Sequence, residues 1–137
     1  MTKVIPTEEQ EMSVLTGWAS VHPKLKHQFF GNLLVHVSNE GKRNVFGGKR
    51  LFTTGGCKKG FPDLFIPIPY ALKKMDGSIS GFKYGALFIE LKRIQGSKIT
   101  IDQEAWINFL NKQGYLAKVC KGAQEAMDLI EWYLGGE

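Results

Sequence analysis

The sequence predicts an α/β protein in which helices flank a central mixed β-sheet. A helical pattern opens the chain after Thr7, continuous apolar runs at 64–68 and 86–91 are typical of buried strands, and two later helical patterns enclose a strand at 115–120. The order helix, three strands, helix, strand, helix is typical of an α/β layout around one sheet. No internal repeat divides the chain, so we expect a single domain over residues 1–137.

The composition narrows the class of protein and of partner. A hydrophobic fraction of 43% excludes a disordered chain, and a net charge of +5 favours a polyanionic partner such as nucleic acid. Cys57 and Cys120 lack the spacing of a metal site or a disulfide scaffold. No apolar run approaches the roughly 20 residues that span a bilayer. Acids also interrupt the N-terminal region, so we expect an intracellular protein without a membrane partner.

The first predicted helix carries acids on the same face as core residues. Thr7 is a suitable N-cap, and acids in the first turn are favoured by the helix dipole. Glu8, Glu11, Leu15 and Trp18 recur at a spacing of three to four residues and therefore share one face. Because Leu15 and Trp18 must face the core, Glu8 and Glu11 lie at its edge. Either glutamate is a candidate active-site carboxylate.

A glycine-rich basic segment follows a short predicted strand at 33–37, in which we interpret His36 as a structural histidine. Glycines let the backbone approach a phosphate closely, and lysines and arginines neutralise its charge. The segment leads directly to Asp63, which favours a surface that binds the DNA backbone. The candidate DNA-binding residues form three pairs: Lys42-Arg43, Lys49-Arg50 and Lys58-Lys59.

Two carboxylates and a lysine lie at the ends of the two predicted buried strands. Asp63 enters the first, while Glu90 and Lys92 project from one side of the second, about 7 Å apart. Mg²⁺ prefers oxygen ligands and usually takes one or two carboxylates from the protein. Asp63, Glu90 and the backbone carbonyl of Leu91 could supply these oxygens. Lys92 would lie beside a bound water and act electrostatically.

The C-terminal part is predicted to contain two helices around the strand at 115–120. Thr100 N-caps a helix over about 101–113, Gly114 ends it, and Gln103 and Trp106 share one stripe. The residues expected on the buried sides are Ile101, Ala105, Phe109 and Leu110 in this helix and Ala126, Leu129, Ile130 and Tyr133 in the last helix.

Together these motifs closely resemble the VRR-NUC branch of the PD-(D/E)xK nuclease superfamily, particularly its stand-alone phage members. The matching segments are Thr7-Glu8-x-x-Glu11 with Trp18, Asn39-Glu40-Gly41-Lys42-Arg43, Lys59-Gly60-Phe61-Pro62-Asp63-Leu64, Phe88-Ile89-Glu90-Leu91-Lys92, Gln103-x-x-Trp106 and Gly114-Tyr115. The resemblance implies a restriction-endonuclease-like core, Mg²⁺ or Mn²⁺ dependence and structure-directed cleavage of DNA. Small stand-alone relatives look like homodimers that resolve four-way (Holliday) junctions. A phage-encoded protein would act in the host cytoplasm.

The resemblance also implies roles for individual residues. Asp63 and Glu90 would bind the metal, Lys92 would be the catalytic lysine, and Gln103 would support the site. A glutamate of the first helix, Glu8 or Glu11, would complete the acidic cluster. Two departures from the usual family pattern are Met12 in place of Gln and Ser38 in place of Pro.

Two other functions remain open. The first is a nicking or flap endonuclease in phage replication or repair, and the second is a DNA-binding module without catalysis. The presence of Asp63, Glu90 and Lys92 together disfavours the second. For a homodimer, the candidate surface aromatic residues are Trp18, Phe29-Phe30 and Trp132-Tyr133.

Overall fold

A computed structural model of the chain describes residues 4–38, 42–44, 50–52 and 58–135. Its helices are α1 (Glu8–Val21), α2 (Ile101–Lys112) and α3 (Ala123–Gly135). Its strands are β1 (Lys26–His27), β2 (Gly31–Asn32), β3 (Val35–His36), β4 (Lys42–Asn44), β5 (Arg50–Phe52), β6 (Leu64–Ile66), β7 (Tyr70–Lys73), β8 (Ile79–Tyr84), β9 (Leu87–Lys92) and β10 (Leu116–Lys121).

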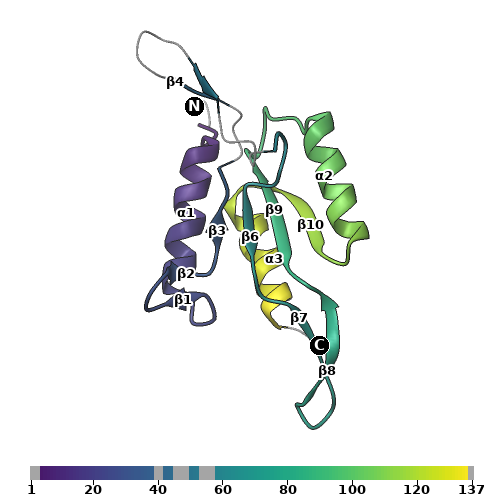
Figure 1. The fold of residues 1–137 in the computed structure, drawn as a ribbon. Coiled ribbons are helices and arrows are strands. Elements are labelled where there is room, and N and C mark those ends of the chain that lie inside the picture. Colours follow the sequence, from purple (N-terminus) through teal and green to yellow (C-terminus); the bar gives the residue numbers. More distant parts are fainter. Residues whose placement is uncertain (1–3, 39–41, 45–49, 53–57, 136–137) are drawn as a thin grey trace.

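The central sheet is mixed and has the strand order β10-β9-β6-β3. β9 pairs parallel with β10 and antiparallel with β6, and β6 pairs antiparallel with β3. α3 and α1 pack against one face of this sheet, and α2 lies on the other side (Figure 1). The predicted α/β fold with helices flanking a mixed sheet is therefore confirmed.

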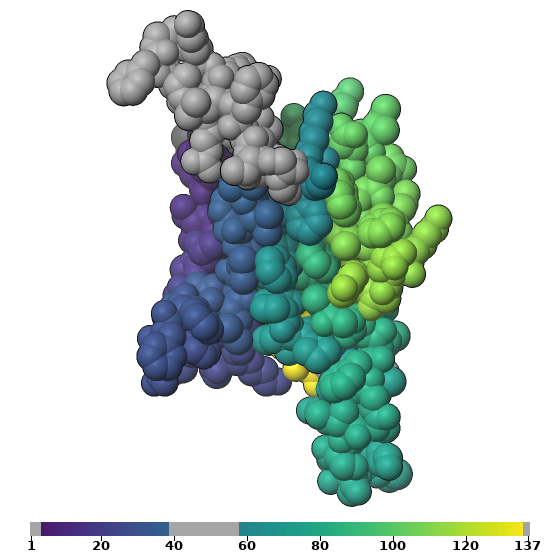
Figure 2. Space-filling model, in the orientation of Figure 1, coloured from purple at the N-terminus to yellow at the C-terminus, as the bar shows by residue number. Residues whose placement is uncertain are grey.

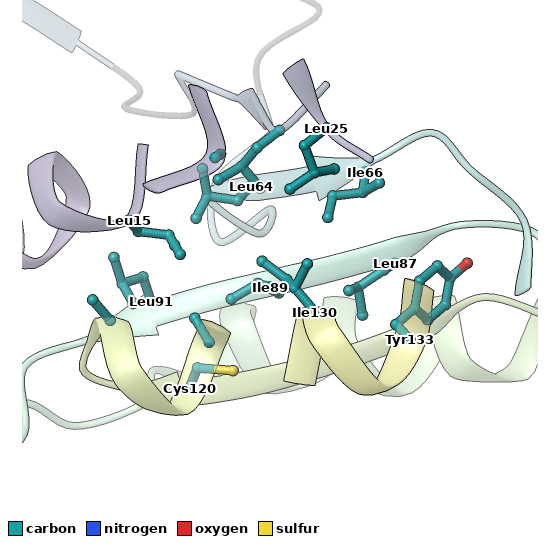
Figure 3. Close-up of a cluster of buried hydrophobic side chains, with 14 of the residues drawn as sticks. Leu15, Leu25, Leu64, Ile66, Leu87, Ile89, Leu91, Cys120, Ile130 and Tyr133 are labelled. Carbon is teal, nitrogen blue, oxygen red and sulfur yellow. The ribbon is translucent and has the colours of Figure 1, made fainter. Parts of the chain in front are cut away.

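The main core lies between the sheet and the helices α1 and α3. Leu87, Ile89 and Leu91 alternate along β9 and are completely buried, together with Leu15 of α1 and Ile130 of α3 (Figure 3). Burying one such side chain contributes about 1.5–3 kcal/mol. Because successive side chains of a strand point to opposite faces, this packing directs the alternate residues of β9 toward the other face of the sheet.

Aromatic rings cover that other face and hold α2 against it. The ring of Phe88 on β9 lies 5.5 Å from that of Phe65 and 5.4 Å from that of Tyr115. Phe61 lies 5.7 Å from Phe88 and 5.0 Å from Trp106 of α2, both in edge-to-face geometry. Such pairs contribute about 0.5–1.5 kcal/mol beyond the area that they bury. These ring contacts help to fix which stripe of α2 faces the sheet.

The prediction of the buried side of α2 is therefore largely wrong. Three of the four residues are exposed: Ile101, Ala105 and Phe109. Leu110 is buried as predicted, but it shares its stripe with Gln103 and Trp106, which face the sheet. An apolar stripe alone did not decide the orientation, because Trp106 has an aromatic partner, Phe61, in the loop before β6. For α3 the predicted side is confirmed, with Ala126, Ile130 and Tyr133 buried.

Several connections differ from the prediction. The β1–β2 hairpin lies before the strand expected at 33–37, and that strand shortens to β3. The strand expected at 64–68 ends before Pro67, which lacks the N–H needed to continue a ladder. The hairpin of β7 and β8 projects from the rest of the described chain (Figure 2).

The aromatic residues considered for a dimer surface differ in their exposure. Tyr133 is 1% exposed, and its hydroxyl donates a hydrogen bond of 2.6 Å to the carbonyl of Ile68, so that part of the prediction is wrong. Trp18 is half-buried against the core, whereas Trp132, Phe29 and Phe30 are exposed. In the described ranges, no helix is long and apolar enough to cross a membrane.

Candidate active site

The strand register brings Asp63 and Glu90 together. β6 and β9 run antiparallel with Leu64 opposite Ile89, so the next pair along the ladder is Asp63 opposite Glu90. Directly opposed side chains lie on one face with their Cβ atoms about 4.5–5.5 Å apart. Asp63 Oδ2 also accepts a hydrogen bond of 3.0 Å from the backbone N–H of Leu91. That bond continues the pairing of β9 beyond the first residue of β6.

Glu90 is a buried carboxyl group in an acidic environment. Its side chain is 2% exposed. Burial, followed by the hydrogen bond and the charge of the neighbouring Asp63 carboxyl, raises the pKa of Glu90 to about 9, and the charge of Lys92 offsets part of this rise. When both acids are ionised neither can donate, and among the described residues Glu90 Oε1 has no hydrogen-bond donor. Two acids in this position therefore require either a shared proton or a cation between them.

Lys92 lies on the same side of β9 as Glu90. Its Nζ is 3.6 Å from Glu90 Oε2, and both side chains are buried. Removing one partner of a buried ion pair typically costs about 3–5 kcal/mol, because it leaves the other charge without compensation. The expected Glu-x-Lys arrangement is thus a close pair inside the protein rather than an exposed ion pair.

Gln103 connects the start of α2 to Glu90. Its backbone N–H donates to Thr100 Oγ1 over 3.1 Å, and its Oε1 accepts from the Thr100 N–H over 2.9 Å, which makes a capping box. The other side-chain atom, Nε2, donates to Glu90 Oε2 over 3.2 Å. A glutamate could complete the same capping box, but only an amide can also donate to Glu90.

Gly60 lets the loop before β6 approach α2. Its φ is +84°, and an added Cβ would lie 2.6 Å from the carbonyl carbon of Asp102 and 2.8 Å from the backbone nitrogen of Gln103. No other residue fits this position without displacing the first turn of α2. The Gly-Phe-Pro-Asp motif therefore brings the α2 N-terminus and Asp63 together, while Phe61 packs its ring on Trp106.

An open groove of about 450 Å³ lies next to this cluster. Its lining residues are Glu8, Glu9, Met12, Ser13, His36, Asp63 and Leu91. It occurs where α1 and β6 begin, at the end of the sheet where β9 finishes (Figure 1). Because the N–H and C=O of one residue point to the same side of a strand, the Leu91 carbonyl faces Asp63 as its N–H does. Asp63 is half-buried, so it connects the buried Glu90 and Lys92 to the groove.

The two glutamates proposed from the first helix have different surroundings. Glu8 is exposed, lines the groove, and adds a smaller rise to the pKa of Glu90 after burial and Asp63. Glu11 is 7% exposed, and its Oε1 accepts a hydrogen bond of 3.2 Å from the backbone N–H of Ala123. That contact places a carboxylate at the N-terminus of α3, where the helix dipole favours it. Glu8 therefore faces the Asp63 side, and Glu11 caps another helix.

Sequence reasoning missed two residues near the site. Arg93, immediately after Lys92, donates from Nε to the Pro6 carbonyl over 3.2 Å and from Nη2 to the Ile5 carbonyl over 3.3 Å. These bonds tie the entry to α1, and hence Glu8, to the end of β9. His36, interpreted as structural, is exposed and lines the groove. The pairing of β3 with β6, which places His36 there, was not readable from one short apolar run.

Comparison with known proteins bears directly on this arrangement. Residues 24–124 match the family model of the VRR-NUC domain, a segment that includes Asp63, Glu90, Lys92 and Gln103. The chain belongs to the VRR-NUC domain family. It is also similar to a solved structure described as a VRR_NUC domain protein, with 26% sequence identity and a TM-score of 0.68. That similarity covers 96% of this chain and 91% of the other. A search of curated proteins found no match.

A VRR-NUC domain implies a nuclease and therefore contact with DNA, and this family generally uses divalent metals. Within the described ranges, no three His, Cys, Asp or Glu side chains converge closely enough to hold a metal ion by themselves. The oxygens that lie together here are those of Asp63, Glu90 and the Leu91 carbonyl, and Glu8 lines the same groove.

The residues predicted to bind DNA are only partly described. Lys58 and Lys59 of the VRR-NUC domain are exposed, and Lys59 Nζ lies 3.5 Å from Asp102 Oδ2 in a solvent-exposed pair. Such pairs contribute about 0–1 kcal/mol, so Lys59 remains available to a phosphate. Three further residues lie in β4 and β5 with side chains outside the description: Lys42, Arg43 and Arg50. Lys49, like the segment 39–41, lies outside the described residues altogether.

Proposed function

We propose that this chain is a Mg²⁺- or Mn²⁺-dependent endonuclease that cleaves branched DNA, with residues 1–137 acting as one nuclease domain. The Asp63–Glu90 pair, in which Glu90 is buried and Asp63 half-buried, carries the proposal, because it is held by Leu91 and Gln103 and accompanied by Lys92. Two acids packed against each other are costly unless a proton or a cation lies between them. Structural stability alone gives no reason for this arrangement.

The oxygens present fit a hard divalent cation. Glu90 Oε1 is buried without a donor, Asp63 is half-buried at the groove, and the Leu91 carbonyl faces the same side. We assign these three groups as metal ligands and Glu8 as a further acid that acts directly or through water. When bound, the ion offsets the charge of the scissile phosphate and makes a water molecule more nucleophilic.

The other side chains prepare this arrangement. Gln103 holds Glu90 through Oε2 and leaves Oε1 free for the ion. Lys92, paired with Glu90 Oε2, is placed to orient the attacking water and to counter the charge that develops on the phosphate. Gln103 is therefore a positioning residue, and Lys92 is the catalytic cation.

The preferred substrate is proposed to be the four-way junction, cut by a homodimer with two symmetric sites. The net charge of +5 and the exposed Lys58 and Lys59 suit a DNA backbone. A nicking or flap endonuclease would use the same residues on another DNA structure. A non-catalytic DNA-binding module has no use for the Asp63–Glu90–Lys92 arrangement.

One preparation should be tested on a four-way junction, a flap and a linear duplex, with Mg²⁺, with Mn²⁺ and with a chelator. Paired symmetric cuts on the junction, dependent on the metal, support the proposal. Cleavage of the flap or the duplex in preference to the junction would instead support a nicking or flap endonuclease. Sedimentation at micromolar concentration tests the homodimer, and a strict monomer would contradict the two-site version.

A further inference from the structure

We propose that the turn between β1 and β2 is a second DNA-binding element, which stacks on an unpaired base of a branched substrate. This inference rests on the proposed function and names how the protein recognises a branch. At the tip of the turn, Phe29 is 79% exposed and Phe30 is 73% exposed. Two adjacent exposed phenylalanines are costly in water, and such patches usually mark interaction sites.

The turn presents these rings in a fixed arrangement. The imidazole of His27 stacks on Phe30 with centroids 4.4 Å apart and an angle of 16° between the planes. His27 Nδ1 accepts hydrogen bonds from the backbone N–H groups of Phe29 (3.1 Å) and Phe30 (3.3 Å). Gly31, with φ at +78°, closes the turn into β2. A preformed aromatic surface loses little conformational entropy when a flat ring stacks on it.

The charge around the turn favours nucleic acid over an apolar protein partner. Between His22 and Ser38 the sequence has no acidic residue. Lys24 and Lys26 are exposed on the same segment. Aromatic rings next to cations match the two parts of a nucleotide, since the base stacks and the phosphate is neutralised. A second copy of this chain would bring like charges together at this surface.

The turn and the catalytic groove are joined along one face of α1. Ser13 lines the groove, and Ser20 lines a hollow formed with Lys26 and His27 beside the turn. Residues seven apart on a helix share a face. After Glu11 the helix has no charged residue, and between the serines this face carries only uncharged Thr16 and Gly17. This face of α1 itself therefore presents no repulsive charge to DNA between the two sites.

The separation suits a short length of DNA. Glu8 begins α1 at the groove, and the β1–β2 turn lies at the opposite end of the helix (Figure 1). A helix of 14 residues spans about 21 Å, which corresponds to about six nucleotides of one strand. Phosphate cleavage at one end and base stacking at the other can therefore involve the same arm of a branched molecule.

The test uses the full chain without metal, so that no cleavage occurs. Binding is measured to a duplex with one unpaired 2-aminopurine and to the fully paired duplex, following fluorescence and affinity. Phe29→Ala/Phe30→Ala is expected to bind the duplex with the unpaired base about tenfold or more weakly. The variant should also no longer quench the fluorescence of the 2-aminopurine. Affinity for the paired duplex should change little. Phe29→Tyr/Phe30→Tyr should restore both signals, and Phe82→Ala, a phenylalanine 58% exposed on β8, is the matched control.

Equal losses on both DNAs, or no loss on either, would overturn the inference. So would dissociation of a dimer by Phe29→Ala/Phe30→Ala in sedimentation, since the occupant would then be a second copy of the chain. The outcome is separable from the proposed function. Stacking that depends on these rings in a protein that never cleaves DNA would reject the nuclease proposal alone. If Phe29→Ala/Phe30→Ala still cleaves DNA and still prefers the duplex with the unpaired base, this inference alone would be rejected.

Discussion

Gln103 donates a hydrogen bond of 3.2 Å from Nε2 to Glu90 Oε2 while its Oε1 completes the capping box of α2. One side chain thus joins the start of a helix to the central acid of the site. The position of Glu90 consequently depends on where α2 begins.

Gln103→Glu should separate the two roles of this residue. The variant keeps the capping box but exchanges the donor to Glu90 for a third negative charge. We expect about 10–100-fold weaker cleavage, in the range typical of residues that orient metal ligands. Gln103→Ala should lose the cap as well, at a cost of about 1 kcal/mol in urea unfolding. Equal cleavage by wild type and Gln103→Glu would contradict a positioning role.

Gly60→Ala should disturb the site through α2. The added Cβ would meet Asp102 at 2.6 Å, and alanine disfavours a φ of +84°. Gly77→Ala is the matched control, because Gly77 has a φ of +88° with nothing within 4 Å of an added Cβ. Both variants should lose about 1 kcal/mol from backbone strain. Only Gly60→Ala should also lose cleavage and further stability, measured by urea unfolding and a junction assay.

Glu8→Gln should affect metal binding and cleavage, whereas Glu11→Gln should affect stability. Glu8 is exposed and lines the groove, so Glu8→Gln should weaken Mn²⁺ binding and cleavage while leaving stability unchanged. Glu11 accepts from Ala123 at the start of α3, so Glu11→Gln should cost about 1 kcal/mol of stability. Mn²⁺ titration and urea unfolding of both variants provide the comparison. A reversed pattern would make Glu11 the active-site acid.

Cys120 should make the stability fall at alkaline pH. Burial and, to a smaller extent, the charge of Glu125 raise the pKa of the Cys120 thiol from 9.0 to about 12, with a partial offset from Lys118 included in that value. A raised pKa in the folded state means that the stability from this group is complete below pH 9 and is lost as the pH rises toward 12. Cys120→Ala should have a flatter profile between pH 9 and 11 in urea unfolding. Parallel profiles for the two proteins would contradict this origin.

The sequence was most informative for elements whose burial follows from their own residues. The continuous apolar run of β9 predicted a central strand, and strand alternation then placed Glu90 and Lys92 on one side. The pairing of β6 with β9 adds what spacing alone left open, namely that Asp63 stands opposite Glu90. Local patterns were sufficient for these elements because their burial follows from their own residues.

The rest depends on contacts between distant segments. The stripe of Ile101, Ala105 and Phe109 is as apolar as the stripe that packs, and distant contacts decide between them: the ring of Phe61 on Trp106 and the hydrogen bond from Gln103 to Glu90. Glu8 and Glu11 lie on one helix, and the N-terminus of α3 separates their roles. Neither partner is near in sequence, so no local pattern could identify them.

The most direct test of the central claim is Mg²⁺-dependent cleavage of a four-way junction by Glu90→Gln. Glutamine keeps the shape of the side chain but removes the charge that the metal and Lys92 require. Glu104→Gln, at an exposed position of α2, serves as the control. We expect the Glu90 variant to fold and to bind the junction with cleavage reduced at least about 100-fold, while the control cleaves as wild type does. Full Mg²⁺-dependent cleavage by Glu90→Gln would contradict the account.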